Sequence, residues 1–331
     1  MAETVDCLVI GGGLSGLTAA SKIREGGRTV RVLDKGRAPG GRMASRRFDR
    51  SAATPAVFDY GAQYFTARDP RFRADVQKWE ALGIVKIWAN GFHMTDGRHK
   101  DTGEPRYRGV PHMRAIADHL SSGLDCRSSV RIVRLEARGQ TWVCTDERGE
   151  QYRGRALLLT MPVPQALILL DDSHLALDPP LHAALGKLQF SPVFSVLLRL
   201  RGPSNLLSPG GLWFSDHPVS WLADNAQKGI SRESAIILHA SPEFSQRHFD
   251  TPPEEVGKML IDSVEDWLGS EVLDFQVHRW RYSFPQATYP RPAESTLCPL
   301  PLFFAGDAFV APRVEGAYLS GLAAAELMSG L

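Results

Sequence analysis

The chain has 331 residues, which allows about two domains with sizeable cores. Its 38 basic residues almost balance its 37 acidic ones, so the net charge provides no general attraction to nucleic acid or to an anionic membrane. The composition, 43% apolar and 23% charged, is ordinary for a folded protein.

The first elements in the chain predict a compact βαβ unit. Residues 5–10 form an apolar run typical of a buried strand, and residues 17–23 have apolar positions at helical spacing. Gly26 and Gly27 end this helix, and residues 29–33 predict the second strand.

Later segments predict a mixture of helices and strands. Helices are expected at 70–82, 112–120, 253–268 and 314–327. Strands are expected at 129–135, 140–144, 156–159, 193–200, 235–240 and 302–305. Residues 91–106 are polar and are expected to be irregular. Prolines gathered between 285 and 301 predict a crossing that returns the chain to its first domain for the last strand and helix.

The cysteines and the N-terminal residues indicate the compartment in which the protein is expected. Cys7, Cys126, Cys144 and Cys298 form no CxxC pair, which argues against a metal site and a redox disulfide. Buried thiols in a reducing cytoplasm are the plain interpretation. We see no signal peptide and no run of about 18 apolar residues. We therefore expect a cytoplasmic protein with small-molecule partners and without metal, nucleic-acid or membrane partners.

A glycine motif follows the first expected strand. Gly11, Gly13 and Gly16 lie between that strand and the next helix, and Asp34 ends the second strand, as in a dinucleotide-binding fingerprint. The first glycine permits a tight turn, the second lets the backbone approach a pyrophosphate, and the third allows close helix packing. Asp34 would accept hydrogen bonds from an adenosine ribose. The alternative is a glycine turn of an ordinary α/β protein.

Two further segments would complete the cradle for a dinucleotide. Residues 37–42 place two glycines between arginines, which suits a loop that reaches phosphate, although a solvated basic turn would look the same. Near the C-terminus, an expected strand runs into Gly306 and Asp307, whose carboxylate suits a chain of sugar-like hydroxyls. The helix expected from Val314 begins with small residues, so its free amides could face a flavin carbonyl or phosphate. A helix packed through small residues is the alternative.

At these residues the sequence resembles the flavoproteins with an FAD-binding Rossmann fold of the glutathione-reductase and amine-oxidase type. Within that group it is similar to the bacterial renalases. The matching segments are 40–43, 59–68, 221–223, 237–240, 278–282, 306–307 and 313–317, which span nearly the whole chain. The Gly-Ala-Gln-Tyr-Phe-Thr block at 61–66 is the more family-specific part, whereas the glycine motifs indicate only FAD.

The resemblance implies an α/β protein with an FAD-binding Rossmann-type domain and a second, mixed α+β substrate domain. We predict the first domain at 1–68, 108–165 and 295–331, and the second at 69–107 and 166–294. The implied activity is oxidation of the 2- or 6-dihydro isomers of NAD(P) to NAD(P)⁺, with hydride passing to the flavin and O₂ reoxidising it to give H₂O₂. A flavin-containing amine oxidase, an NAD(P)H-dependent flavin monooxygenase and a non-catalytic FAD-binding protein remain alternatives.

The resemblance also assigns roles to individual residues. The residues expected to bind FAD are Gly11, Gly13, Gly16, Asp34, Lys35, Arg42, Gln63, Tyr64, Phe65, Val130, Gly306, Asp307, Val314, Glu315, Gly316 and Ala317. Residues 63–65 are expected near the isoalloxazine ring, because glutamine can bond flavin edges and aromatic rings can stack on a nicotinamide. The catalytic candidates are Tyr64, His239 and Trp280, and Trp221 and Tyr282 are expected as walls of a flat pocket. Each has a plain alternative as a core residue, as does Val130.

Hydride transfer from a dihydropyridine needs little acid–base help, since the donor becomes an aromatic cation. The site then mainly orients the donor carbon and excludes competing chemistry. The lack of an obvious acid–base pair in the sequence therefore agrees with the implied reaction.

Overall fold

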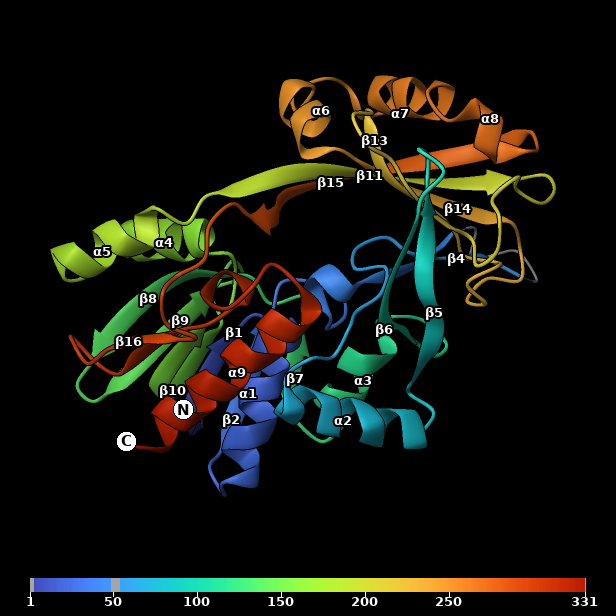
Figure 1. Cartoon of the computed structure of the whole chain (residues 1–331). Coiled ribbons are helices and arrows are strands. Elements are labelled where there is room, and N and C mark those ends of the chain that lie inside the picture. Colours follow the sequence, from blue (N-terminus) through green and yellow to red (C-terminus); the bar gives the residue numbers. More distant parts are fainter. Residues whose placement is uncertain (1–2, 49–53, 331) are drawn as a thin grey trace.

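A sheet assembled from segments far apart in the sequence forms one half of the fold (Figure 1). The computed structural model describes residues 3–48 and 54–330. The strands of this sheet are β1 (Thr4–Ile10), β2 (Val30–Asp34), β7 (Asp125–Ser128), β8 (Ile132–Arg138), β9 (Thr141–Asp146), β10 (Gln151–Leu159), β16 (Glu294–Thr296) and β17 (Leu302–Phe304). The main path is β16-β17-β10-β1-β2-β7, and β8 and β9 join it at β10. From β17 to β7 the strands are parallel.

The sequence of β1 explains why helices cover both faces of this sheet. Leu8 and Ile10 belong to one buried cluster, whereas Cys7 and Val9 belong to another. Because neighbouring residues of a strand point to opposite faces, an unbroken apolar run buries both faces. The helices on the first face are α4 (Val163–Asp172) and α5 (Pro179–Gly186), and those on the second are α1 (Leu14–Glu25), α3 (Ala115–Ser121) and α9 (Val314–Ser329).

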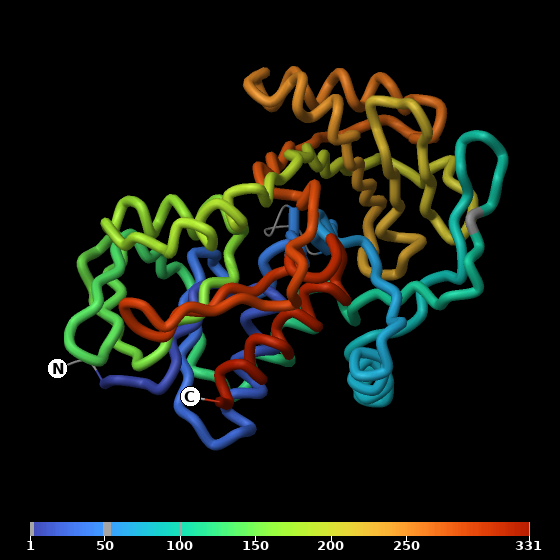
Figure 2. Tube along the Cα trace, turned by 60° about the vertical axis from the view of Figure 1, so that its left-hand side comes forward, coloured from blue at the N-terminus to red at the C-terminus, as the bar shows by residue number. Residues whose placement is uncertain are grey.

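Helix α9 brings a late segment of the chain back to its first helix. Figure 2 shows this segment beside the N-terminal part of the chain. A side chain at Gly321 would overlap the backbone of Ser15 in α1, so glycine permits the close approach of the two helices. Helix α2 (Pro70–Ala81) packs against α9 from the outside, through Phe72 and Tyr318.

A second, mainly antiparallel sheet forms the other half of the fold. Its strands are β5 (Val85–Met94), β6 (His99–Gly109), β11 (Phe190–Leu200), β12 (Gly211–Trp213), β13 (Val219–Asp224), β14 (Ala235–Ala240) and β15 (Val272–Pro285), in the order β15-β11-β14-β13-β12-β5-β6. One face is covered by α6 (Pro242–Arg247), α7 (Pro253–Asp262) and α8 (Glu265–Leu268), which lie above the sheet in Figure 1.

The opposite face of the second sheet packs against a short hairpin from the N-terminal part of the chain. This hairpin consists of β3 (Ser45–Phe48) and β4 (Ala56–Asp59). Phe48 and Phe58 share a buried cluster with Leu197, Trp221 and Ile237 of the second sheet. The turn that follows β4 is therefore held between the two halves of the fold.

The expected βαβ unit and most later elements are confirmed, but several expectations were wrong. Residues 91–106 are not irregular: they belong to the β5–β6 hairpin, whose charged outer positions hide the strand pattern. The strand expected from 129 begins only at Ile132. The helix expected at 253–268 is interrupted between α7 and α8. The long strand β15 had no prediction, because aromatic and charged residues alternate irregularly along it.

Two further findings concern the described ranges as a whole. Within 3–48 and 54–330, no helix combines the length and apolar character needed to cross a membrane. In the same ranges, no cluster of three or more histidine, cysteine or acidic side chains is arranged to hold a metal ion. The boundaries between the two expected domains stay a prediction, and α4 and α5, beyond residue 165, pack on the first sheet.

Candidate active site

The turn from β1 into α1 has the shape of a phosphate-binding loop. Gly11 has a φ of +116°, in the region that favours glycine, and a side chain at Gly16 would overlap the Gly11 carbonyl. At Gly13, in contrast, nothing lies within 4 Å of the position that a Cβ atom would take. Gly13 also caps α1 without a side-chain hydrogen bond. The first amides of α1 are therefore available to a pyrophosphate.

Asp34 lies at the carboxyl end of β2, beside this loop. Its carboxylate accepts hydrogen bonds from the amides of Gly12 at 2.5 Å and Gly36 at 2.6 Å. Val130 is not in a strand, yet its amide donates to the Asp34 carbonyl at 2.9 Å, so it lies at the predicted ribose side. Lys35 is exposed and donates to Gln165 at 2.9 Å, which turns its ammonium toward α4.

The C-terminal segment reaches the same region through Asp307. Arg42 donates through both terminal nitrogens to Asp307, at 2.7 and 2.6 Å, and also to the carbonyl of Ser283 at 2.8 Å. The Gly306 amide donates to the Ser320 hydroxyl at 2.8 Å. The structure thus brings two predicted cofactor residues together, but it pairs their charges with each other.

The first turn of α9 carries the remaining predicted cofactor residues. Val314, Gly316 and Ala317 lie at a helix start that has no side-chain cap. Glu315 differs from them, because its carboxylate accepts the amides of Arg68 at 2.5 Å and Asp69 at 2.7 Å. The side chain of Glu315 therefore anchors the segment before α2, and its contact with FAD stays a prediction.

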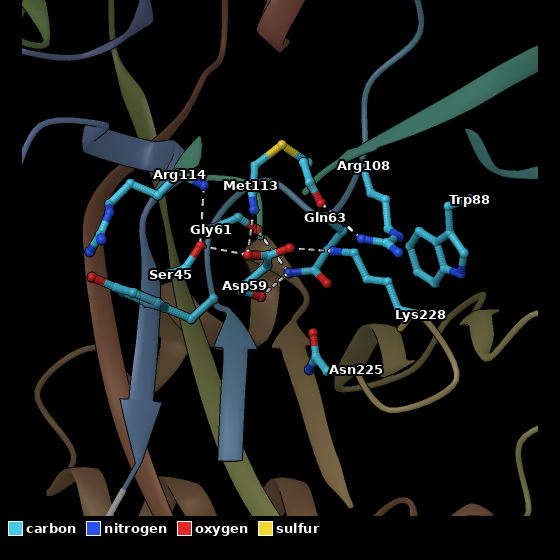
Figure 3. A network of polar contacts seen from close by, with 12 residues as sticks. Ser45, Asp59, Gly61, Gln63, Trp88, Arg108, Met113, Arg114, Asn225 and Lys228 are labelled. Carbon is cyan, nitrogen blue, oxygen red and sulfur yellow. Dashed lines mark hydrogen bonds and ion pairs between the residues drawn. The ribbon is translucent and has the colours of Figure 1, made fainter. Parts of the chain in front are cut away.

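The turn after β4 places Gln63 in the centre of a polar network (Figure 3). The Gln63 amide nitrogen donates to the carbonyls of Asp59 and Gly61, the latter at 3.0 Å. Gln63 is only 7% exposed, and its buried side-chain oxygen has no hydrogen-bond partner in the part of the chain that the structure describes. The two carbonyls fix the orientation of the amide, because each can only accept.

His239 and Trp280 meet at one backbone carbonyl of this turn. The indole of Trp280 donates to the Tyr60 carbonyl at 3.1 Å, and Nε2 of His239 lies 3.3 Å from the same oxygen. This carbonyl makes Nε2 the protonated nitrogen of the neutral ring. Burial lowers the pKa of His239 to about 4, so the ring is neutral near pH 7. The ring of Tyr60 stacks on Trp280, with 5.2 Å between centroids.

Tyr64 and Phe65 point into different environments. Tyr64 lies in an aromatic cluster, which we define as Tyr64, Trp88, Phe92, Trp213 and Trp221. Phe65 is 4% exposed and stacks on Tyr107 instead, in the core beside α2. Phe65 therefore contributes to packing, and its aromatic side chain is not placed with Gln63.

Three cations lie beside this cluster, and one of them, Lys228, had no prediction from the sequence. Lys228 pairs with Asp59 at 2.8 Å, and both side chains are fully buried. The ammonium of Lys228 lies 4.9 Å from the ring centre of Trp88, and the guanidinium of Arg106 lies 5.5 Å from that of Phe92. Figure 3 shows Arg108 beside Lys228. Lys228 lies in a polar turn, where no sequence pattern marks it as a site residue. Asp59 to Gly61, in contrast, lie at the end of a strand, a position at which sequence reasoning could have looked for site residues.

The uncapped helix and the unpaired polar atoms of this region fit FAD. Space lies in front of Gly13 and the uncapped α1, next to a carboxylate at the end of β2. The side-chain oxygen of Gln63 and the indole N–H of Trp221 are buried polar atoms without a hydrogen-bond partner among the described residues. Such atoms are normally satisfied, and a bound group with donors and acceptors would supply their partners.

The fold and the glycine loop define the class of the protein, which is an α/β dinucleotide-binding protein of the Rossmann type. A model of NAD(P)-binding Rossmann-like domains matches residues 9–79, and a model of flavin-containing amine oxidoreductases matches residues 80–329. The chain belongs to the flavin-containing amine oxidoreductase family. The expected fold class is confirmed, and the protein is an FAD-dependent oxidoreductase.

Solved structures share this architecture at low sequence identity. A protein from Exiguobacterium sp. 255-15, named as a candidate protoporphyrinogen oxidase, has a TM-score of 0.74 at 12% identity, with all of both chains covered. A putrescine oxidase bound to putrescine has a TM-score of 0.70 at 13% identity, also with full coverage. At such identities the similarity shows the fold alone.

The half-buried His239 makes the stability of the protein depend on pH. In the unfolded chain His239 would titrate near its ordinary pKa of 6.5, whereas in the folded protein its pKa is about 4. The unfolded state therefore binds more protons between these values, and stability falls as the pH drops from 6.5 toward 4. From pH 7 to pH 5 we expect His239 to contribute a loss of about 2 kcal/mol.

Urea unfolding at pH 7 and pH 5 measures this effect. His239→Gln keeps a donor for the Tyr60 carbonyl but removes the titration, so its pH dependence should be smaller than that of the wild type. His119→Gln, on the exposed side of α3, is the matched control and should keep the wild-type dependence. An unchanged pH dependence in His239→Gln would show that the folded protein does not lower the pKa of His239.

Proposed function

We propose that the protein oxidises dihydronicotinamide isomers, the 2- or 6-dihydro forms of NAD(P), to NAD(P)⁺. The observation that carries the proposal is the charge beside the aromatic cluster. In the part of the chain that the structure describes, the lysine and arginine residues in the core are Arg106, Arg108 and Lys228, at 4%, 5% and 2% exposure. Asp59 neutralises Lys228, so Arg106 and Arg108 supply the net positive charge at this place. That charge favours an anionic substrate, such as one that carries a pyrophosphate.

The same cations argue against an amine as substrate. Aromatic rings bind organic cations through their faces, and an amine oxidase would use that property. Here Lys228 already lies over Trp88, and Arg106 lies over Tyr64 and Phe92. Asp59, which would be a partner for an ammonium group, is occupied by Lys228. A substrate ammonium would therefore meet like charge where it needs an acceptor.

The chemistry needs little from the side chains beyond orientation. Bound FAD supplies the hydride acceptor and the reaction with O₂. One dihydronicotinamide, one O₂ and one proton give one NAD(P)⁺ and one H₂O₂. The stacked rings of Tyr60 and Trp280 form an aromatic wall beside the turn that carries Gln63. His239 is neutral, because burial lowers its pKa to about 4, so it adds no positive charge that would oppose formation of the pyridinium product.

Anaerobic stopped-flow reduction of the FAD-loaded protein tests this proposal. We would mix it with the 2- and 6-dihydro isomers of NAD and NADP, with ordinary NADH, and with putrescine and other amines, and follow bleaching of the flavin. The isomers should bleach it fast, and NADH and the amines slowly. In air, one H₂O₂ should form for each NAD(P)⁺.

Other outcomes would overturn the proposal. Fast bleaching by amines alone would make the protein an amine oxidase. Fast bleaching by ordinary NADPH, followed by oxygen insertion into an added acceptor, would make it a monooxygenase. No bleaching by any of these donors would favour a non-catalytic role for the FAD.

A further inference from the structure

A fully buried ion pair joins the hairpin of the N-terminal part of the chain to the second sheet. Lys228, in the turn after β13, donates to Asp59 at the end of β4 over 2.8 Å, with neither side chain exposed. The other carboxylate oxygen of Asp59 accepts from the Ser45 hydroxyl at 2.6 Å and from the Met113 amide at 2.9 Å. Asp59 is therefore fixed from three separate segments of the chain.

The backbone around Lys228 is itself rigidly held. The carboxylate of Asp224 accepts the amides of Ala226 at 2.8 Å and Gln227 at 3.1 Å, and the Lys228 amide donates to the Asp224 carbonyl at 2.9 Å. The backbone from which the Lys228 side chain extends to Asp59 is thus fixed by Asp224. Lys228 therefore attaches the end of β4 to the second sheet.

Asp59, which Lys228 binds, is the first residue of the turn that carries Gln63. The carbonyl of Asp59 accepts from the Gln63 amide nitrogen, and the Gly61 carbonyl accepts from the same nitrogen at 3.0 Å. Both protons of the amide are used by these two carbonyls. The side-chain oxygen of Gln63 must then point away from them, and it is buried without a partner from residues 3–48 or 54–330.

We infer that Lys228 and Asp59 are positioning residues, which fix Gln63 so that its side-chain oxygen accepts a hydrogen bond from an N–H group of the bound FAD. A buried acceptor without a hydrogen bond costs free energy, so a donor is expected beside it, and the isoalloxazine ring carries N–H groups. The inference concerns the cofactor and not the substrate, so it does not depend on the proposed function.

The test compares three altered proteins. Gln63→Met removes the acceptor. The paired replacement Asp59→Asn with Lys228→Met removes the ion pair while the net charge of the site stays the same. The third protein combines both changes. For each, we would measure the FAD dissociation constant and the midpoint potential of the flavin by dithionite titration with a reference dye, which requires no substrate.

The expected result is that Gln63→Met and the paired replacement each weaken FAD binding by about tenfold, as the loss of a hydrogen bond to a buried acceptor does. Both should shift the midpoint potential in the same direction by a similar amount. The combined protein should show no further change in either quantity, because the two replacements remove the same interaction. Neutralising the exposed pair of α7, by Glu254→Gln with Lys258→Met, is the matched control and should change neither.

Three results would overturn the inference. If Gln63→Met changes neither quantity, its oxygen does not meet the cofactor. If the paired replacement lowers the melting temperature but leaves affinity and potential unchanged, the ion pair is only structural. Additive effects in the combined protein would show that the pair acts independently of Gln63. Should the paired protein not fold, Ser45→Ala, which removes one donor from Asp59, must give a smaller shift of the same sign; no shift would reject the inference.

Discussion

Replacing Gly16 with valine is expected to abolish FAD binding. A side chain at this position would overlap the carbonyl of Gly11 and would lie 2.8 Å from the hydroxyl of Thr160. The carbonyl belongs to the phosphate-binding turn itself, so relief of the overlap would move the turn away from α1. The first amides of α1 would then no longer face the pyrophosphate. The measurement is the ratio of flavin to protein after purification, together with FAD titration of the flavin-free protein.

A matched replacement separates this effect from a general loss of folding. Gly186 ends α5, and nothing lies within 4 Å of its Cβ position, so Gly186→Val should carry the wild-type amount of FAD. Gly16→Ala should lose less FAD than Gly16→Val, with far-UV circular dichroism near that of the wild type. One FAD per chain in Gly16→Val would show that the turn does not hold the cofactor in the way described.

The single replacement Lys228→Met is expected to lower the free energy of unfolding by about 3–5 kcal/mol, because it leaves a buried carboxylate without its counter-ion. Both side chains of the pair with Asp59 are completely buried, so water cannot replace the lost ammonium. Urea denaturation of the FAD-loaded and the flavin-free protein would measure the change in the free energy of unfolding. The loss should appear in both forms, since the ion pair lies within the protein.

Two controls make this expectation specific. Lys258→Met removes an ammonium from an exposed pair on α7 and should leave the denaturation midpoint unchanged within error. Adding Asp59→Asn to Lys228→Met should recover much of the lost stability, because no uncompensated charge then remains buried. If Lys228→Met is as stable as Lys258→Met, the ammonium is not needed where the structure places it.

Local patterns predicted the part of the site that depends on neighbouring residues. Gly11, Gly13, Gly16 and Asp34 lie within one βαβ unit, so their spacing along the chain determines their arrangement in space. The predicted meeting of this unit with Asp307 is also consistent with the structure, because a strand that ends in Gly-Asp carries a recognisable signal. The confirmed family membership supports the FAD assignment that these patterns favoured.

The remainder of the site depends on contacts between distant segments, which no local pattern encodes. Lys228 meets Asp59 only because the second sheet packs on the β3–β4 hairpin. No local pattern showed that the carboxylate of Glu315 would accept amides from the chain before α2. Phe65 had the right residue type for stacking on a ligand, but Tyr107 of β6 provides its partner. Each of these outcomes was decided by tertiary packing.

The arrangement of the first sheet has a consequence for how the protein is made. Strands β1 and β17 are separated by most of the described chain, yet only β10 lies between them in the sheet. During translation, the ribosome releases Gly11 to Gly16 long before the segment that carries Gly306 and Val314. The second sheet must therefore be synthesised before the cofactor site can be enclosed, so a chain that stalls after β14 would expose an unfinished sheet edge and could not retain FAD.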